Sequence, residues 1–89
     1  MIKKALVIHP DGHEESLENQ PSLLEVRKIV EGYVEVIPTI FCKDTTVTMA
    51  LGNEDGRLIG LTKNPKASSL LNYNVVGNIV ILKGWRDLK

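Results

Sequence analysis

Apolar and polar residues form short patterned segments along the chain, and these predict several β-strands and a single helix. Residues 2–8 and 13–18 read as two strands. The intervening sequence "HPDG" is typical of a four-residue turn, so the two strands are expected to form an N-terminal hairpin. The acidic residues of the second strand are expected on the solvent side or along an edge of the sheet, where charge discourages unwanted strand pairing.

A short amphipathic helix is predicted after this hairpin. Ser22 and Glu25 have the spacing of a capping box, and Gly32 stands where a left-handed residue would end the helix. A helix of about three turns is too short to be stable alone, so its apolar face must pack on the sheet. Four apolar residues at helical spacing form that face: Leu23, Val26, Ile29 and Val30.

The rest of the chain predicts more strands. Residues 33–37 end at Pro38, residues 45–51 are rich in β-branched side chains, and residues 57–61 are expected to pair with them across a glycine-rich turn. A last strand is predicted at residues 79–83. The order is β-β-α-β-β-β-loop-β, which indicates a single α+β domain over residues 1–89 with a mainly antiparallel sheet.

Composition narrows the class of protein. The chain has 89 residues, of which 43% are hydrophobic and 25% charged, as is typical of one small globular domain. Its eleven basic and eleven acidic side chains cancel, which argues against attraction to nucleic acid or to an anionic membrane. The lone cysteine fits a reducing compartment. The apolar run at residues 5–8 is too short for a secretion signal, and no membrane span is evident, so we expect a cytoplasmic protein.

Several segments together resemble a known family. They are the start "MIKKALVIHP", the helix end "IVEGYVEV", the sequence "NEDGRLIGL" leading to "LTKN", and the late "VVGNIVIL". In order and spacing they are similar to a family of short phage and plasmid proteins that is catalogued only as a domain of unknown function, over roughly residues 1 to 84. That family usually has a proline where this chain has Thr62, while Asn64 matches. The resemblance implies a viral or mobile-element origin in a host cytoplasm, and it brings no catalytic residues.

Candidate catalytic and metal-binding residues are few. His9 and His13 are four residues apart, but Pro10 and Gly12 oppose the helix that would align both rings on one metal, so polar turn residues are the preferred interpretation. Cys42 has no histidine near it in sequence to act as its base, and we interpret it as structural. We therefore expect no enzymatic activity, no metal and no cofactor.

The loop "LTKNPKASS" carries a mixture of charge and hydrogen-bond donors that suits phosphate or ribose oxygens. Backbone amides near its serines could also open a short helical turn that favours an anion. The alternative is a solvated crossover between two strands, whose lysines keep it in water. The candidate ligand-binding residues of the loop are Lys63, Asn64, Lys66, Ser68 and Ser69. Arg57 is a further candidate, which joins them only if the chain folds back.

Three large rings with polar tips are candidates for an interface: Tyr33, Tyr73 and Trp85. Packing at the edge of the core is their alternative role. A chain this short buries a thin core, so we also expect a homo-oligomer.

The function predicted from these features is that of a non-enzymatic phage or mobile-element protein that acts against host defence. In this interpretation it forms a homo-oligomer that sequesters a small anionic, nucleotide-like signal in a pocket between protomers. The alternative is an inhibitor that docks on a host protein through a strand edge or the acidic hairpin. Regulation through nucleic acid is the least favoured class because the net charge is zero.

Overall fold

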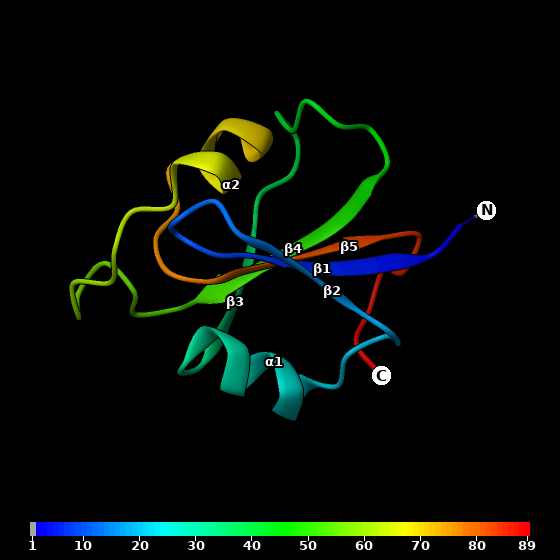
Figure 1. Cartoon of the computed structure of the whole chain (residues 1–89), viewed down its shortest axis with the longest axis horizontal. Helices are drawn as coiled ribbons and strands as arrows, with labels where there is room; N and C mark the ends of the chain where they lie inside the picture. Colours follow the sequence, from blue (N-terminus) through cyan, green and yellow to red (C-terminus); the bar gives the residue numbers. More distant parts are fainter. Residues whose placement is uncertain (1) are drawn as a thin grey trace.

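The computed structural model describes residues 2–89 and consists of a five-stranded sheet with one helix on each face (Figure 1). Its elements, in chain order, are β1 (Lys4–Ile8), β2 (Glu14–Leu17), α1 (Leu23–Val30), β3 (Val34–Ile37), β4 (Val47–Asn53), α2 (Pro65–Leu71) and β5 (Ile79–Lys83). The predicted α+β class with an antiparallel sheet is confirmed. The prediction of a single helix was wrong, because residues 65–71 form a second one.

The sheet has the strand order β2-β1-β5-β4-β3, and every neighbouring pair is antiparallel. The predicted N-terminal hairpin is confirmed, with Ile8 opposite Glu14. The central strand, β5, lies between β1 and β4, whereas β2 and β3 form the two edges.

Both faces of the sheet are apolar, and this explains why two helices are needed. In β1, residues 5–8 are all buried although successive side chains point to opposite faces, and residues 79–82 of β5 behave in the same way. One face packs against α1 and the other against α2, which lie on opposite sides of the sheet in Figure 1. A strand buried on both sides reads as a continuous apolar run, as these two segments do.

The strand predicted at residues 57–61 was wrong, and with it the second hairpin. Residues 54–60 form successive turns, in which the Ile59 amide donates to the Asp55 carbonyl and the Leu61 amide to the Gly56 carbonyl. The physical reason is that β4 already pairs with β3 on one side and β5 on the other. No edge of β4 remains for a third partner.

Helix α1 confirms most of its predicted features. Ser22 and Glu25 form the capping box, Val26 and Val30 are buried, and Ile29 is half-buried against the same cluster. Leu23, in contrast, is 52% exposed, so its predicted place on the buried face was wrong.

The end of α1 also differs from the prediction, because Glu31 and not Gly32 is the left-handed residue. Gly32 is required for another reason. A Cβ at this position would lie 2.6 Å from the Nδ2 atom of Asn53. That amide donates to the carbonyls of Val30 and Glu31, so the glycine leaves room for the side chain that satisfies the helix end.

The buried face of α2 generates a stability prediction. Leu71 is fully buried, and we expect Leu71→Ala to lower the free energy of unfolding by about 2–5 kcal/mol, because it removes buried methyl groups and leaves a cavity. The same truncation at Leu24, which is 60% exposed on α1, should change it by less than about 0.5 kcal/mol. Urea unfolding of both variants measures the two values, and equal losses would contradict the assignment of α2 to the core.

A second prediction concerns acid stability. Hydrogen bonds from the Thr46 hydroxyl, from Lys83 and from the Thr46 amide lower the pKa of Asp44 from 3.8 to about 2. Because the folded carboxyl binds a proton less readily than the unfolded one, its contribution is complete above about pH 4 and is lost as the pH falls toward 2. Asp44→Asn should therefore flatten the decline in stability between pH 4 and 2. Unfolding curves recorded across that range test this, and an unchanged slope would exclude it.

Candidate functional site

The candidate site is a hollow formed by the turns after β4, the start of α2 and the segment before β5. Lys63 and Val76 form an isolated antiparallel bridge that holds the two chain segments together. The backbone amide of Asn64 donates to the Val75 carbonyl, and the backbone amide of Gly77 donates to the Thr62 carbonyl. Gly77 has a positive φ of 72°, a conformation that glycine adopts without strain.

The hollow has a volume of about 540 Å³. It contains three of the predicted ligand-binding residues, Arg57, Lys63 and Ser68, so the chain does fold back to bring the arginine to this loop. The remaining lining residues are Leu61, Pro65, Asn74, Val75 and Val76. Four of these eight lining residues are therefore apolar, and two carry cationic side chains.

The two charged side chains in the lining are both cationic. Arg57 also lines a second, smaller hollow next to this one, which contains Glu35 and Glu54. The Arg57 guanidinium donates to the Asn74 carbonyl, which fixes it at the junction with the neighbouring hollow. Lys63 is exposed and forms no ion pair within residues 2–89. The lining contains no carboxylate, imidazole or thiol. An anion entering here would meet two cations and no acidic side chain of the lining.

Ser68 lines the hollow but is already engaged. Its Oγ accepts from the Val75 amide at 2.9 Å and donates to the Val75 carbonyl at 3.3 Å. The hydroxyl therefore uses both its donor and an acceptor position to fasten the apolar wall to α2. Its role in this geometry is to position the wall.

Asn64 lies beneath the site and does not face it. The side chain is fully buried, its Nδ2 donates to the Ile8 carbonyl at 2.8 Å and to the Gly77 carbonyl at 2.9 Å, and its Oδ1 accepts from the Ala67 amide at 3.1 Å. Because its donors are both used by the fold, we remove Asn64 from the candidate ligand residues. It is the N-cap of α2, and it joins that helix to the end of β1.

Lys66 and Ser69 are also outside the lining. The Lys66 ammonium forms an ion pair with Glu14 at 2.6 Å and donates to the Gly12 carbonyl at 3.1 Å, so it joins α2 to the N-terminal hairpin. The hydrogen bond from Lys66 to the Glu14 carboxylate lowers the pKa of Glu14. The Ser69 hydroxyl accepts from Lys43 at 3.4 Å. Of the residues predicted from the loop, only Arg57 and Lys63 present available charge to the hollow.

The three predicted interface rings have different environments. Tyr33 is 63% exposed, with the Arg27 guanidinium 4.7 Å from its ring centre. Tyr73 is exposed and lines a smaller hollow of about 170 Å³ next to the first. Trp85 is half-buried and packs on the apolar cluster under α1, which is the alternative role that the sequence left open.

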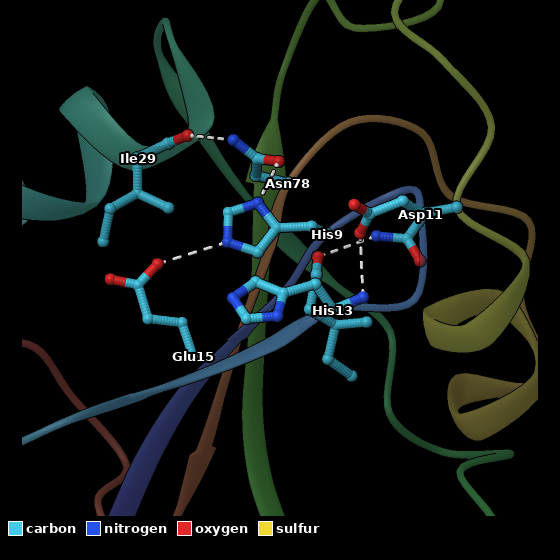
Figure 2. Close-up of polar contacts among 8 residues, drawn as sticks. His9, Asp11, His13, Glu15, Ile29 and Asn78 are labelled. Atoms are coloured by element: carbon cyan, nitrogen blue, oxygen red, sulfur yellow. Dashed lines mark hydrogen bonds and ion pairs between the residues drawn. The ribbon is translucent and has the colours of Figure 1, made fainter.

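The histidine pair lies at the N-terminal hairpin, far along the sequence from the loop (Figure 2). The two rings of His9 and His13 stack with their centres 5.3 Å apart. The nitrogens of His9 face Oδ1 of Asn78 at 3.0 Å and Oε1 of Glu15 at 3.2 Å, and Asn78 in turn donates to the Ile29 carbonyl. His9 thus connects the hairpin, through Asn78 directly before β5, to α1. Within residues 2–89, no three or more His, Cys, Asp or Glu side chains are grouped to hold a metal ion.

The sequence interpretation missed the apolar wall, and of the helix that supports it expected only a short helical turn near the serines. The available signal was Asn64 followed by Pro65, because asparagine is a preferred N-cap and proline is favoured at the first helical position. Cys42 is half-buried, and its thiol donates to the Asp44 carbonyl at 3.4 Å.

The chain matches no known protein family, no curated protein and no solved structure at a significant level. The candidate site is therefore defined by its own geometry. The resemblance to short phage and plasmid proteins stays a hypothesis.

The buried amide of Asn64 generates a prediction. Asn64→Asp keeps the shape but places a carboxylate against two carbonyl oxygens, and we expect it to lower the free energy of unfolding by more than about 2 kcal/mol at pH 7. The loss should shrink at acidic pH, because a protonated carboxyl can donate to one of those carbonyls. Asn72→Asp is the matched control at the exposed C-cap of the same helix, with an expected cost below about 1 kcal/mol. Thermal and urea unfolding measure both, and a mild, pH-independent effect at Asn64 would contradict this role.

Proposed function

We propose that this protein binds and sequesters a small anionic, nucleotide-like molecule in the hollow between Arg57 and α2. The observation that carries the proposal is the joint placement of Arg57 and Lys63 on an apolar lining that has no acidic side chain. The volume of about 540 Å³ lies within the range of about 300–1,000 Å³ that is usual for small-molecule sites.

The two parts of the lining suit the two parts of a nucleotide. Arginine and lysine bind phosphate oxygens through charge-assisted hydrogen bonds, and arginine can do so in a bidentate manner. The aliphatic wall of Leu61, Val75 and Val76 offers apolar surface to a base. Backbone bonds across the Lys63–Val76 bridge hold both walls, so the hollow is formed within one chain and needs no second protomer.

Binding without chemistry is favoured by the residue types in the lining. General acid–base or nucleophilic catalysis needs a titratable group or an activated nucleophile against the substrate. The one hydroxyl side chain in the lining, that of Ser68, bonds to Val75 in both directions. A protein that holds a signal and does not convert it fits an anti-defence role, and the resemblance to phage and plasmid proteins implies that it would act in a host cytoplasm. None of the helices in residues 2–89 is long and apolar enough to cross a membrane.

Inhibition of a host protein is the second candidate function. Docking through the acidic hairpin loses support, because Glu14 and Glu15 already contact Lys66 and His9. The observation in favour is the set of large apolar side chains on the surface, among them Leu58 at 87% and Ile59 at 59% exposed in the turns beside Arg57. Association with a protein covers such side chains.

The binding proposal predicts the effect of removing the two cations. Each charge-assisted contact is worth about 1.5–3 kcal/mol, so Arg57→Ala combined with Lys63→Ala should weaken binding by roughly two to four powers of ten. The melting temperature should change little, because both side chains are exposed. Calorimetric titration with a panel of cyclic and linear nucleotides measures the affinity.

Lys66→Ala is the matched control for this experiment. It removes the same kind of charge from the same segment, but its ammonium binds Glu14 and not the hollow, so nucleotide affinity should be unchanged. If the wild-type protein binds no nucleotide in the panel, sequestration is excluded and docking on a protein becomes the preferred function. If Lys66→Ala weakens binding as much as the double variant, the hollow is not the site.

A further inference from the structure

The strand β3 is an edge of the sheet whose outer side has no neighbour in residues 2–89. Its inner side pairs with β4, and the Glu54 amide donates to the Tyr33 carbonyl at 2.8 Å. In an antiparallel ladder, hydrogen-bonded pairs alternate with pairs that are not bonded to each other. Because residue 33 bonds inward, residues 35 and 37 do so too, and the backbone groups of Val34 and Val36 point outward.

These outward groups form no hydrogen bond within the described chain. An unpaired row of this kind can accept another strand. The side chain of Val36 is 64% exposed, so the same position offers apolar surface as well as a free amide and carbonyl.

Exposed apolar side chains lie close in sequence to both ends of this strand. Tyr33, directly before it, is 63% exposed, and Ile40 and Phe41, three and four residues after it, are 81% and 65% exposed. Pairing of four residues alone buries little surface, whereas specific interfaces usually exceed about 1,000 Å² in total. These flanking side chains supply the additional apolar area that a stable interface needs.

Self-pairing of β3 is restricted to one register by its own residues. An antiparallel pair in one continuous sheet can be centred on Glu35 or on Val36. Centring on Glu35 would place two carboxylates directly opposite each other, which is destabilising. Centring on Val36 places the partner's Val36 opposite it, and Glu35 then lies opposite the partner's Ile37. The second register forms an apolar β-branched pair at the two-fold axis and avoids repulsion between like charges.

Pro38 is tolerated in the same register, at the loss of one hydrogen bond at each end of the pairing. The Val34 amide donates to the carbonyl of the partner's Pro38, whereas the Val34 carbonyl accepts no bond there because proline has no N–H.

We propose that a second copy of this chain pairs with β3 in antiparallel fashion, with Val36 at the two-fold axis, to form a continuous ten-stranded sheet. The opposite edge is a poorer candidate. β2 presents Glu14 and Glu15, which contact Lys66 and His9 in the same chain. Pairing of β3 with β2 of another copy would be heterologous and would extend into an open filament, whereas self-pairing of β3 closes as a dimer.

Sedimentation velocity at micromolar concentration is the first test, and the wild-type protein is expected to sediment as a dimer. Val36→Glu places two carboxylates at the axis, so this variant should be monomeric with a nearly unchanged melting temperature. It should also retain the nucleotide affinity of the wild type, because the hollow lies within one chain. Ser16→Glu, at an exposed position of the β2 edge, is the matched control and should remain dimeric.

Cysteine cross-linking tests the register and does not depend on how Val36→Glu folds. In a Cys42→Ala background, Val36→Cys should form an intermolecular disulfide on mild oxidation. The Cα atoms of a hydrogen-bonded antiparallel pair lie about 5.5 Å apart, within the range of about 4.4–6.8 Å for disulfides. Glu35→Cys should cross-link far less, since two such cysteines are not opposite each other.

A monomeric wild-type protein would overturn the proposal and leave the β3 edge to a different partner. A Val36→Glu variant that folds and remains dimeric would place the interface elsewhere. Preferential cross-linking through Glu35→Cys would show a different register.

Discussion

The buried side-chain amide of Asn64 is the interaction on which the arrangement of the sheet, α2 and the candidate site depends. It donates to the end of β1 and to the turn before β5, and it accepts from the first turn of α2. These groups come from three separate parts of the sequence. A single amide can satisfy all of them because it carries two donors and an acceptor in one plane. Without it, two buried carbonyl oxygens would lack a partner, and the helix that walls the hollow would lack its cap.

Two other asparagines fasten the structure in a similar way. Asn53 satisfies the last carbonyls of α1 from the end of β4, and Asn78 joins His9 to the Ile29 carbonyl (Figure 2). Each helix is short, so its terminal groups are a large share of its hydrogen-bonding capacity. Side chains from the sheet side satisfy those groups, and apolar packing on both faces adds the stabilisation that the helices lack alone.

The pairing of strands within the sheet accounts for two surface features, the hollow and the free edge of β3. Since β4 has a neighbour on each side, the chain that follows it cannot form another strand and instead turns back with Arg57 beside α2. This places Arg57 and Lys63 in the lining of one hollow. At the far edge, β3 is left with one neighbour only, and its outer backbone groups are directed to solvent.

Local signals determined a large part of the fold in advance. The turn after Ile8, the capping box at Ser22 and the continuous apolar runs of β1 and β5 act over a few residues, so the hairpin, α1 and most strands could be predicted. The strand predicted at residues 57–61 from the turn before them was wrong, because a strand forms only where a neighbour is free to pair with it, and that depends on the whole sheet.

For the candidate site, the sequence identified a segment with the right chemistry but could not assign its members. Asn64 and Lys66 carry donors of the kind that a ligand site uses. The side-chain amide of Asn64, however, is buried and donates to two backbone carbonyls, and the ammonium of Lys66 forms an ion pair with Glu14. Arg57 and Lys63 remain because no acidic side chain lies in the lining of the hollow. Residue types and local spacing were therefore determined by the sequence itself. Which polar groups the fold uses internally, and which it leaves for a ligand, was decided by the tertiary structure, because hydrogen-bond partners come from segments that are distant along the chain.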